Sequence, residues 1–559
     1  MSKLAWAGLV LAGFLVVSGC SDDKNAVVKD TGDNTEAPET PQTALKITQA
    51  GRYQVSPFAF DEGAAEIVTY DPRLMRLYVV NSSARTVDVL DITDPDAITR
   101  IGQIDATAEG ASANSVAVSD TTVAVAIEAE TKTDPGAVVF YNASDFTKLG
   151  EATVGALPDM VTFTPDGQRV LVANEGEPSD DYATDPEGSV SVIDVSRGFQ
   201  MPDVQTAGFS AYNDQVDALR ERGVRIFGPG ASVAQDLEPE YIAVADDGET
   251  AYVSLQENNA VAIVDIENAG ITTINALGEK DFSQDGQGID PSNNDGLHIR
   301  KVPVFGLYQP DTIAVFTDGD TRYLLTANEG DARDYDGFSE EADVKDVALD
   351  PQVFPNAAAL QEDSALGDLK ITTTLGDTDD DGDYEALYAY GARSFSIRRA
   401  ADAGLVYDSA DDFEQITGQR YGDGFNADNT GNDGDDRSDN KGPEPEALAT
   451  GVIDGRRYAF IGLERMSGFM VYDITAVEAP SFVTYINNRD LDVDPESGQA
   501  GDLGPESIVF ISADDSPIDD QPLLAVGNEV SGSTTLYRLN LIAANDDNDS
   551  MQNGMAEDE

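Results

Sequence analysis

Short apolar runs alternate with turn residues between residues 45 and 541, and this alternation repeats as a unit. A proline next to an acidic residue opens a short apolar strand, an Asp-Gly-type hairpin turn follows, and a second strand ends near a glutamate. A third strand alternates Val or Ile with small residues. The clear copies are 157–195, 238–266, 309–330, 443–474 and 504–539, and weaker copies are 65–92 and 113–142.

Seven such units of about 40 residues predict an all-β fold, a single seven-bladed β-propeller. A solenoid is the alternative, whereas separate sandwiches are disfavoured because the motif keeps one register. In a propeller the first strand of each blade lines the channel, and the second returns to the mouth where the first began. We therefore expect two sets of acidic residues at one mouth: Asp159, Glu240, Asp311, Glu446 and Glu506 at the starts of first strands, and Glu175, Glu257, Glu329, Glu464 and Glu529 at the ends of second strands.

The long insertions of the repeat fall on the same side. On this register, loops that leave the second strand or precede the next first strand emerge at the acidic mouth. A face that is elaborated by loops is typical of a working face. The insertions are 176–188, 197–237, 279–308, 330–385, 419–442 and 487–503.

The two ends of the chain differ from this body. Residues 1–19 are typical of a lipoprotein signal peptide, and the chain's single cysteine, Cys20, follows the apolar stretch in the sequence Val-Ser-Gly-Cys. An ordinary signal peptide with a chance cysteine is the alternative. We predict a lipid on Cys20, a flexible acidic tether over 20–44, the propeller over 45–541 and a disordered acidic tail over 542–559. Ser21 rather than Asp follows the cysteine, which favours the outer membrane of a bacterial cell envelope.

The excess of acidic residues restricts the classes of ligand that the chain is expected to bind. The chain has 104 Asp plus Glu against 34 Lys plus Arg, a formal net charge of −70. This charge repels nucleic acid and anionic lipid, so neither is expected as a ligand, and we expect a monomer. It is typical either of a solvated surface suited to salty surroundings or of many cation sites. With one histidine and no phosphate-binding glycine loop, a His-based zinc site and a P-loop are excluded.

Several motifs carry a family resemblance. They include ANEGEPSDDY (173–182), GLYQPDTIAVF (306–316), TANEGDARDY (326–335), RSDNKGPEPEALA (437–449) and GNEVSGSTTLYRL (527–539). Through them the chain resembles bacterial surface proteins with a choice-of-anchor I domain, which are propellers of the YVTN/WD40-like superfamily. The resemblance covers roughly 45–541. It implies a cell-surface location, and family members are often labelled alkaline phosphatase or phytase-like.

Ten carboxylates around one channel need partners, because like charges at about 4 Å repel by about 4 kcal/mol at an effective dielectric constant near 20. Oxygen-rich sites suit Ca²⁺, so we predict Ca²⁺ at the ten acidic positions of the mouth, with neutral oxygens from Asn174, Asn328 and Asn528. The alternative is a solvated acidic funnel with arginine partners such as Arg333 and Arg465.

A second candidate Ca²⁺ site lies in residues 377–385, DTDDDGDYE. Its Asp-x-Asp-x-Asp-Gly run matches the first half of an EF-hand loop, whose twelfth position would here be Tyr388 instead of Glu. The candidate ligands are Asp377, Asp379, Asp381 and Asp383, and residues 428–441 form a weaker acidic cluster.

Two functions fit these patterns. One is a Ca²⁺-binding surface propeller that holds an extracellular ligand or partner through its acidic mouth. The other, which the family labels suggest, is a Ca²⁺-dependent phosphoesterase in which metal ions activate water. Its candidate residues are Glu329, with Arg333 and Lys441 to hold phosphate oxygens, and Arg437 and Arg465 could assist.

Overall fold

The computed structural model describes residues 43–543, and the residues from Leu45 to Ile542 form one compact unit. The predicted signal peptide and Cys20, and nearly all of the predicted tether and tail, lie outside the described residues. No helix within 43–543 is long and apolar enough to cross a bilayer.

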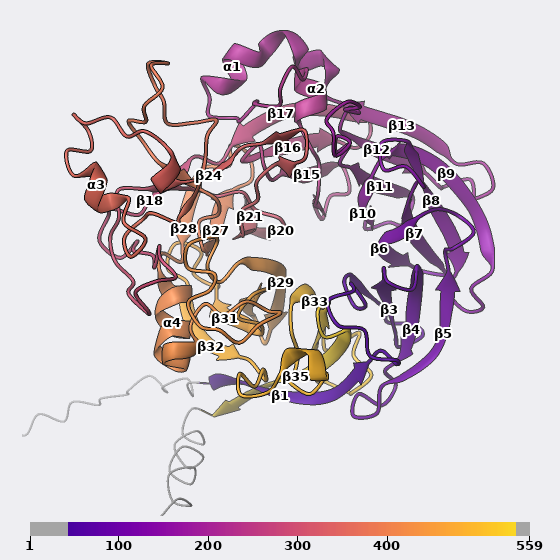
Figure 1. Ribbon diagram of the computed structural model, residues 1–559. Helices are drawn as coiled ribbons and strands as arrows, with labels where there is room; N and C mark the ends of the chain where they lie inside the picture. Colours follow the sequence, from indigo (N-terminus) through magenta and orange to yellow (C-terminus); the bar gives the residue numbers. More distant parts are fainter. Residues whose placement is uncertain (1–42, 544–559) are drawn as a thin grey trace, which may run out of the picture. The chain divides into compact units, whose positions relative to one another are not determined.

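Seven four-stranded sheets form the body of this unit, each with neighbouring strands antiparallel (Figure 1). Their innermost strands follow one another around the central channel, and β2 lies against β6 on one side and against β33 on the other. The predicted all-β propeller is therefore confirmed.

The first four sheets in chain order consist of consecutive strands. They are β2 (Val68–Asp71), β3 (Arg76–Asn81), β4 (Thr86–Asp91) and β5 (Thr99–Asp105); β6 (Ser112–Ser119), β7 (Thr122–Glu128), β8 (Pro135–Asn142) and β9 (Lys148–Ala156); β10 (Pro158–Phe163), β11 (Arg169–Asn174), β12 (Ser189–Asp194) and β13 (Asp203–Gly208); and β14 (Ile242–Val244), β15 (Thr250–Leu255), β16 (Ala260–Asp265) and β17 (Gly270–Ala276).

The last three sheets include one with a long insertion and one that closes the ring. They are β20 (Ile313–Asp318), β21 (Thr321–Asn328), β27 (Ser394–Arg399) and β28 (Leu405–Asp408); β29 (Pro445–Ile453), β30 (Arg456–Leu463), β31 (Phe469–Asp473) and β32 (Ser481–Ile486); and β33 (Pro505–Ile511), β34 (Leu523–Asn528), β35 (Ser533–Ala543) and β1 (Thr43–Gln54). The first strand of the chain is thus the outermost strand of the last sheet.

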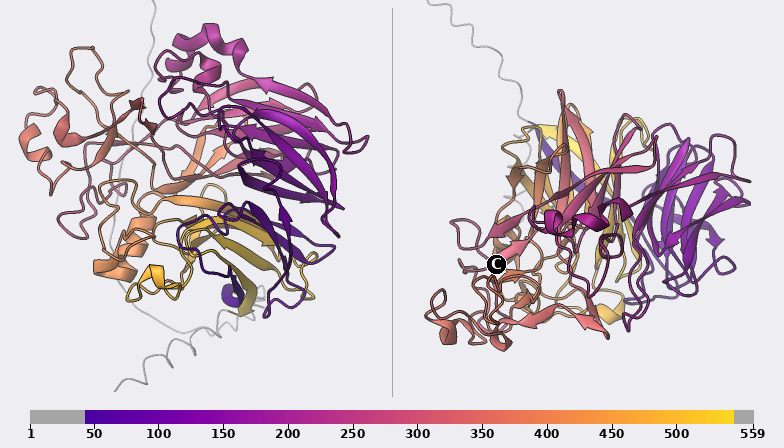
Figure 2. Two further views of the ribbon diagram at one scale, coloured as in Figure 1. Left: turned by 45° about the vertical axis from the view of Figure 1, so that its right-hand side comes forward. Right: turned by 90° about the horizontal axis from the view of Figure 1, so that it is seen from above.

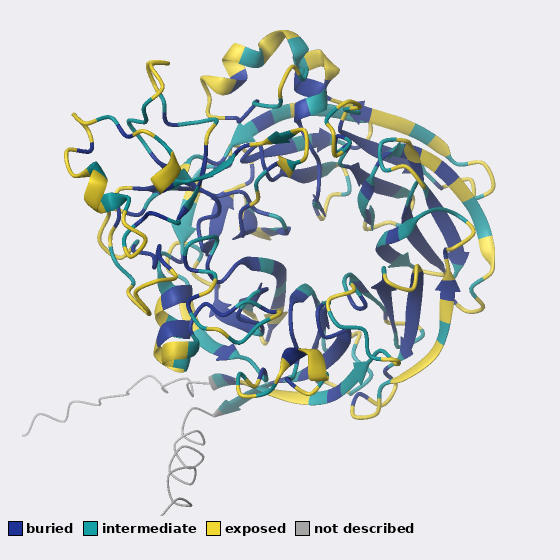
Figure 3. Cartoon of the chain, viewed as in Figure 1, coloured by how far each residue is buried: buried dark blue, intermediate teal, exposed yellow. Residues whose placement is uncertain are grey.

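Burial explains the strand patterns. The middle strands are apolar throughout because neighbouring sheets cover both of their faces, as in β11, where five of six residues are buried. The outer strand β13 has one buried residue in six and carries mostly polar side chains. Figure 3 shows this change from buried inner strands to exposed outer edges.

The insertions carry the remaining elements. Between β17 and β27, a five-stranded sheet is built from β18 (Glu279–Asp281), β19 (Phe305–Leu307), β26 (Tyr388–Ala389), β25 (Lys370–Thr372) and β24 (Glu341–Asp343), beside a hairpin of β22 (Asp334–Tyr335) and β23 (Phe338–Ser339). In the right-hand view of Figure 2, this segment projects beyond one end of the propeller strands.

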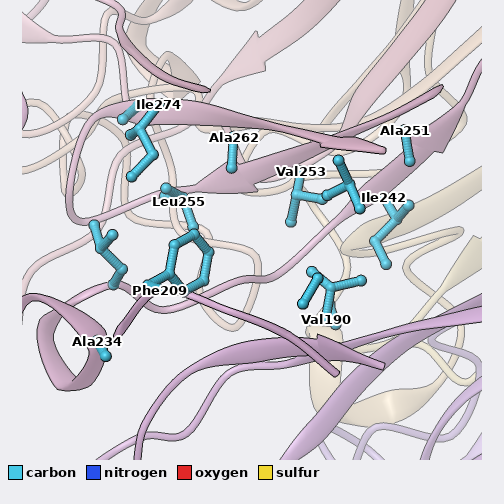
Figure 4. Close-up of a cluster of buried hydrophobic side chains, with 14 of the residues drawn as sticks. Val190, Phe209, Ala234, Ile242, Ala251, Val253, Leu255, Ala262 and Ile274 are labelled. Carbon is cyan, nitrogen blue, oxygen red and sulfur yellow. The ribbon is translucent and has the colours of Figure 1, made fainter. Parts of the chain in front are cut away.

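Helices are short and lie almost entirely in the insertions. They are η1 (Ser210–Gln215), α1 (Val216–Arg220), α2 (Val233–Asp236), η2 (Val344–Asp346), α3 (Ala357–Leu360), α4 (Asp412–Tyr421), η3 (Gly422–Gly424) and η4 (Pro495–Ser497). The segment with η1, α1 and α2 is anchored by Phe209 and Leu219, which are fully buried in a cluster with Val190 and Leu255. Figure 4 shows Phe209 beside Leu255 in this cluster.

One predicted insertion contains a blade strand. Residues 197–237 include β13, which pairs with β12 along its whole length, from Ser189 opposite Gly208 to Asp194 opposite Asp203. The true insertion of this blade therefore begins after Gly208. The strand escaped prediction because its exposed face is polar, so its sequence, DVQTAG, lacks the apolar run of the inner strands.

Candidate functional site: the acidic channel mouth

The ten predicted acidic residues lie where the repeat places them. Asp159, Glu446 and Glu506 stand at the starts of β10, β29 and β33, and Glu240 and Asp311 stand two residues before β14 and β20. The other five follow the ends of second strands by one residue or two: Glu175, Glu257, Glu329, Glu464 and Glu529. The structure brings them to one mouth, where neighbouring members interact electrostatically.

A hollow of about 330 Å³ opens into the channel between these residues. Four carboxylates line it, from Glu66, Asp159, Asp311 and Glu506, and no Lys or Arg of the described chain does. Burial raises the pKa of Glu66 to about 8 and that of Asp159 to about 7, because a charged carboxylate is costly away from water. The side-chain charges that line the hollow are therefore all acidic.

On one side of the mouth, three glutamates converge. One carboxylate oxygen from each of Glu175, Glu238 and Glu257 lies within 4.8 Å of the other two. Glu238 and Glu257 are 1% and 5% exposed, and Oε1 of Glu238 and Oε2 of Glu257 have no hydrogen-bond partner among the described residues. Burial raises the pKa of all three carboxyl groups, that of Glu257 to about 7.

Arg333 provides this group with its one ion pair within the described chain. Its Nη2 lies 3.0 Å from Oε2 of Glu238, and its Nη1 lies 2.7 Å from Oδ1 of Asp236. The guanidinium also stacks on Phe227 at 4.5 Å from the ring centroid. Because the Arg333 side chain has no exposed surface, it is not accessible to a phosphate group from solvent, and the expected phosphate contact is not supported by this geometry.

The neighbouring side of the mouth, formed by the blades of β20 and β29, is rich in cations. Glu444 is fully buried, and its carboxylate accepts hydrogen bonds from Arg437 at 2.7 Å and Arg465 at 3.0 Å, while Lys441 Nζ lies 3.2 Å away. Burial raises the pKa of the Glu444 carboxyl, but the three cations outweigh burial and hold this pKa well below its usual range. The Glu444 carboxylate therefore has three protein cations as partners.

The same cations also reach neighbouring predicted residues. Lys441 donates to Oε1 of Glu329 at 2.7 Å, and Arg465 lies 3.1 Å from Oε1 of Glu464. Gln256 donates to the other oxygen of Glu329, Oε2, at 2.9 Å. Asn429 donates to Oε1 of Glu464 at 3.0 Å. Oxygens of Glu329, Glu444 and Glu464 lie within 4.8 Å of one another, and protein donors already bond to both oxygens of Glu329 and Glu444 and to Oε1 of Glu464.

The asparagines before the glutamates do not face the mouth, contrary to expectation. Asn174 donates to Ser191 Oγ at 3.0 Å, and Asn328 donates to Ser396 Oγ at 2.8 Å, so both amides bond to the adjacent strand of their own sheet. Asn528 likewise donates to the Ser533 carbonyl at 3.1 Å. Consecutive residues of a strand point to opposite faces, so Asn and the following Glu cannot both serve one site.

Besides Glu66, the sequence patterns did not assign Glu238 and Glu444 to the mouth. Each precedes the proline that opens a first strand, in LEPEY and PEPEA. Only the acidic residue after the proline was assigned to the mouth. The repeated Glu-Pro-Glu was the available signal, since it occurs at the same position of two blades.

The second candidate loop is partly assembled. Oxygens of Asp377, Asp379 and Glu385 lie within 4.8 Å of one another, and Asp383 forms a second such group with Glu385 and Asp350. Asp381 belongs to neither group and accepts from the Asp383 N–H at 3.2 Å. In the weaker cluster 428–441, the Asp428 carboxylate lies 3.8 Å from Arg437 and 3.9 Å from Arg465, so it belongs to the cation-rich side.

Two solved structures cover most of this chain at low sequence identity. The β-propeller domain of Myceliophteria thermophila Cps50 (Swd1) covers 87% of this chain and 98% of its own, with a TM-score of 0.41 and 10% identity. Kuenenia stuttgartiensis hydrazine synthase gives a TM-score of 0.43 and 13% identity, over 88% of this chain and 99% of its own.

The sequence comparisons identify the family of the chain. Gigasin-3a of Magallana gigas is 30% identical over 192 residues, which are 32% of this chain and 67% of that protein. The family model of the choice-of-anchor I domain matches residues 66–477, most of the propeller and its insertions. A choice-of-anchor domain suggests a cell-surface protein. The chain therefore belongs to the choice-of-anchor I family.

Proposed function

We propose that this protein is a lipid-anchored, Ca²⁺-binding propeller of the bacterial cell envelope, which binds an extracellular ligand through its loop-elaborated mouth. The observation that carries the proposal is the convergence of Glu175, Glu238 and Glu257, with two buried carboxylate oxygens that have no hydrogen-bond partner among the described residues. Buried polar atoms are nearly always paired, so unpaired carboxylate oxygens that face one another indicate a bound cation.

Calcium suits this group better than other common ions. It takes six to eight oxygen ligands in flexible geometry, and carboxylates can bind it through one oxygen or both. Arg333 balances part of the charge of Glu238, whereas Glu175 and Glu257 make no ion pair within the described residues. A divalent ion would supply the missing charge, and water would complete its coordination. The lipid anchor rests on Cys20, and Cys20→Ser should move the protein to the soluble fraction.

Thermal unfolding tests the metal. Because a ligand of the native state stabilises it by mass action, Ca²⁺ at 100 times its Kd should add about 2.7 kcal/mol to the free energy of unfolding, and chelator should remove this gain. Mg²⁺ at the same concentration should add less, since it requires a stricter geometry. An unfolding curve that is identical in Ca²⁺ and in chelator would leave an acidic mouth without a metal.

A second candidate function, a Ca²⁺-dependent phosphoesterase, is favoured by one hollow of about 210 Å³ that Arg437, Lys441 and Asp331 line together. Lys441 and Arg437 are 12% and 18% exposed, so unlike Arg333 they are accessible to a phosphate. This function requires Ca²⁺-dependent hydrolysis of a chromogenic phosphomonoester or of phytate that is lost in Lys441→Gln. Absence of turnover with either substrate would exclude it and leave the binding propeller.

A further inference from the structure

A larger cavity lies apart from the channel hollow and shares no lining residue with it. Its volume is about 540 Å³, within the range of small-molecule sites in proteins. The segment after α1 forms one wall, and loops beside β19 and β26 form the other. Apolar side chains make up most of the walls: Val224, Ile226, Phe227, Leu307, Leu375 and Tyr388.

A buried arginine lines this cavity and has one hydrogen-bond donor without a partner among the described residues. Arg225 lines the cavity, is 5% exposed and stacks on Phe227 at 4.2 Å from the ring centroid. Its Nη1 donates to the Glu257 carbonyl at 2.5 Å, and its Nη2 donates to Thr374 Oγ1 at 3.0 Å and pairs with Glu340. The Nε–H has no hydrogen-bond partner among residues 43–543. A ligand oxygen would satisfy this donor.

The charged residues of the cavity favour an anion. In a chain of net charge −70, this cavity is lined by two arginines and one glutamate. The second arginine, Arg220, is exposed, and its Nε donates to the Ile226 carbonyl at 2.8 Å, which holds the guanidinium beside the apolar wall. Glu279 is the exposed acidic residue of the lining.

We propose that this cavity binds a small amphipathic anion, with an aromatic or aliphatic body and one carboxylate or sulfonate group. The body packs between Phe227, Leu375 and Tyr388. The anionic group accepts from Arg225 and interacts with Arg220. None of the carboxylates that would hold Ca²⁺ lines this cavity, and Arg225 contacts Glu257 only at its backbone carbonyl, so we expect binding here to persist in chelator.

Two fluorescent probes of similar body and different charge test the site on the purified protein. We expect 1-anilinonaphthalene-8-sulfonate, an aromatic anion, to bind one per chain, and N-phenyl-1-naphthylamine, its neutral analogue, to bind more weakly. Leu375→Trp fills the cavity and should weaken both probes by at least about tenfold. Met201→Ala, at a side chain that is 91% exposed in another blade, is the matched control and should change neither probe.

The charge variants separate an anion site from an apolar cavity. Arg220→Gln should weaken the sulfonate probe about fivefold, and Glu279→Gln should tighten it two- to threefold, with no change for the neutral probe. Both residues are exposed, so these variants remain informative if Leu375→Trp lowers stability. Equal changes for both probes in Arg220→Gln and Glu279→Gln, or sulfonate binding that Leu375→Trp leaves intact, would overturn the proposal.

Discussion

The sequence Glu-Pro-Glu occurs at 238–240 and at 444–446, at the same position of two blades, yet its first glutamate has opposite surroundings in the two places. Glu444 is held by Lys441, Arg437 and Arg465, and its pKa lies well below the usual range. Glu238 has Arg333 alone, which it shares with Asp236, and burial raises its pKa.

The difference arises from the loops. The blade repeat determines where each carboxylate lies, but the inserted segments determine whether a cation meets it. Arg437 and Lys441 come from the insertion before β29, and Arg465 follows β30 directly. On the other side, Arg333 comes from the insertion after β21 and is the one cation that pairs with Glu238 in the described chain. Glu444 therefore meets three protein cations, whereas Glu175 and Glu257 make no ion pair within the described residues.

The largest effect should follow removal of the balanced carboxylate. Glu444→Gln leaves three buried or half-buried cations without their shared partner, so we expect a loss of about 3–5 kcal/mol in the free energy of unfolding. Chemical denaturation measures this loss. A loss below about 1 kcal/mol would show that the cations have other adequate partners and would contradict the contrast between the two sides.

Acid unfolding should sharpen the contrast. A Glu whose pKa is lower in the folded state than its unfolded value of 4.5 adds stability that is present above pH 4.5 and is lost as pH falls toward the folded pKa. Glu444 should therefore contribute a slope of up to about 1.4 kcal/mol per pH unit below pH 4.5, and Glu444→Gln should lack it. Denaturation at a series of pH values from 3 to 6 measures the slope, and equal slopes in both proteins would exclude this role.

A smaller effect is expected at the matching residue of the other side. Glu238→Gln keeps the volume and an acceptor for Arg333, which also retains Asp236, so in chelator the loss should be below about 1 kcal/mol. In Ca²⁺ the variant should lose most of the metal-dependent stabilisation. Denaturation in the two conditions gives both numbers. A loss of several kcal/mol in chelator would mean that Arg333 depends on the charge of Glu238, as the three cations around Glu444 depend on the charge of Glu444.

Much of this architecture could be predicted from the sequence, and the reason lies in the repeat. Short apolar strands and Asp-Gly turns recur in one register, so the propeller and the ten carboxylates at the mouth followed from local patterns. The polar strand β13 and the pairing of β1 with β35 did not follow, because outer strands carry little apolar signal and closure joins residues from the two ends of the body.

The cation partners could not be predicted for a different reason. Arg333 was expected to hold a phosphate, and only its contacts with Asp236 and Glu238, from another insertion, show that it is a buried structural residue. Nothing in the local sequence of Arg333 or Lys441 distinguishes a buried ion pair from an accessible cation. These roles depend on how separate loops pack, which no repeat specifies.

We propose that Ca²⁺ occupies the Glu175–Glu238–Glu257 side of the mouth and not the cation-rich side. Calorimetric titration of Ca²⁺ into Glu257→Gln and Glu464→Gln tests it most directly, because both glutamates follow the second strand of their blades. We predict that Glu257→Gln weakens one Ca²⁺ site at least about tenfold, and that Glu464→Gln, whose carboxylate already pairs with Arg465, leaves it unchanged. Equal weakening in both variants, or in neither, would contradict the account.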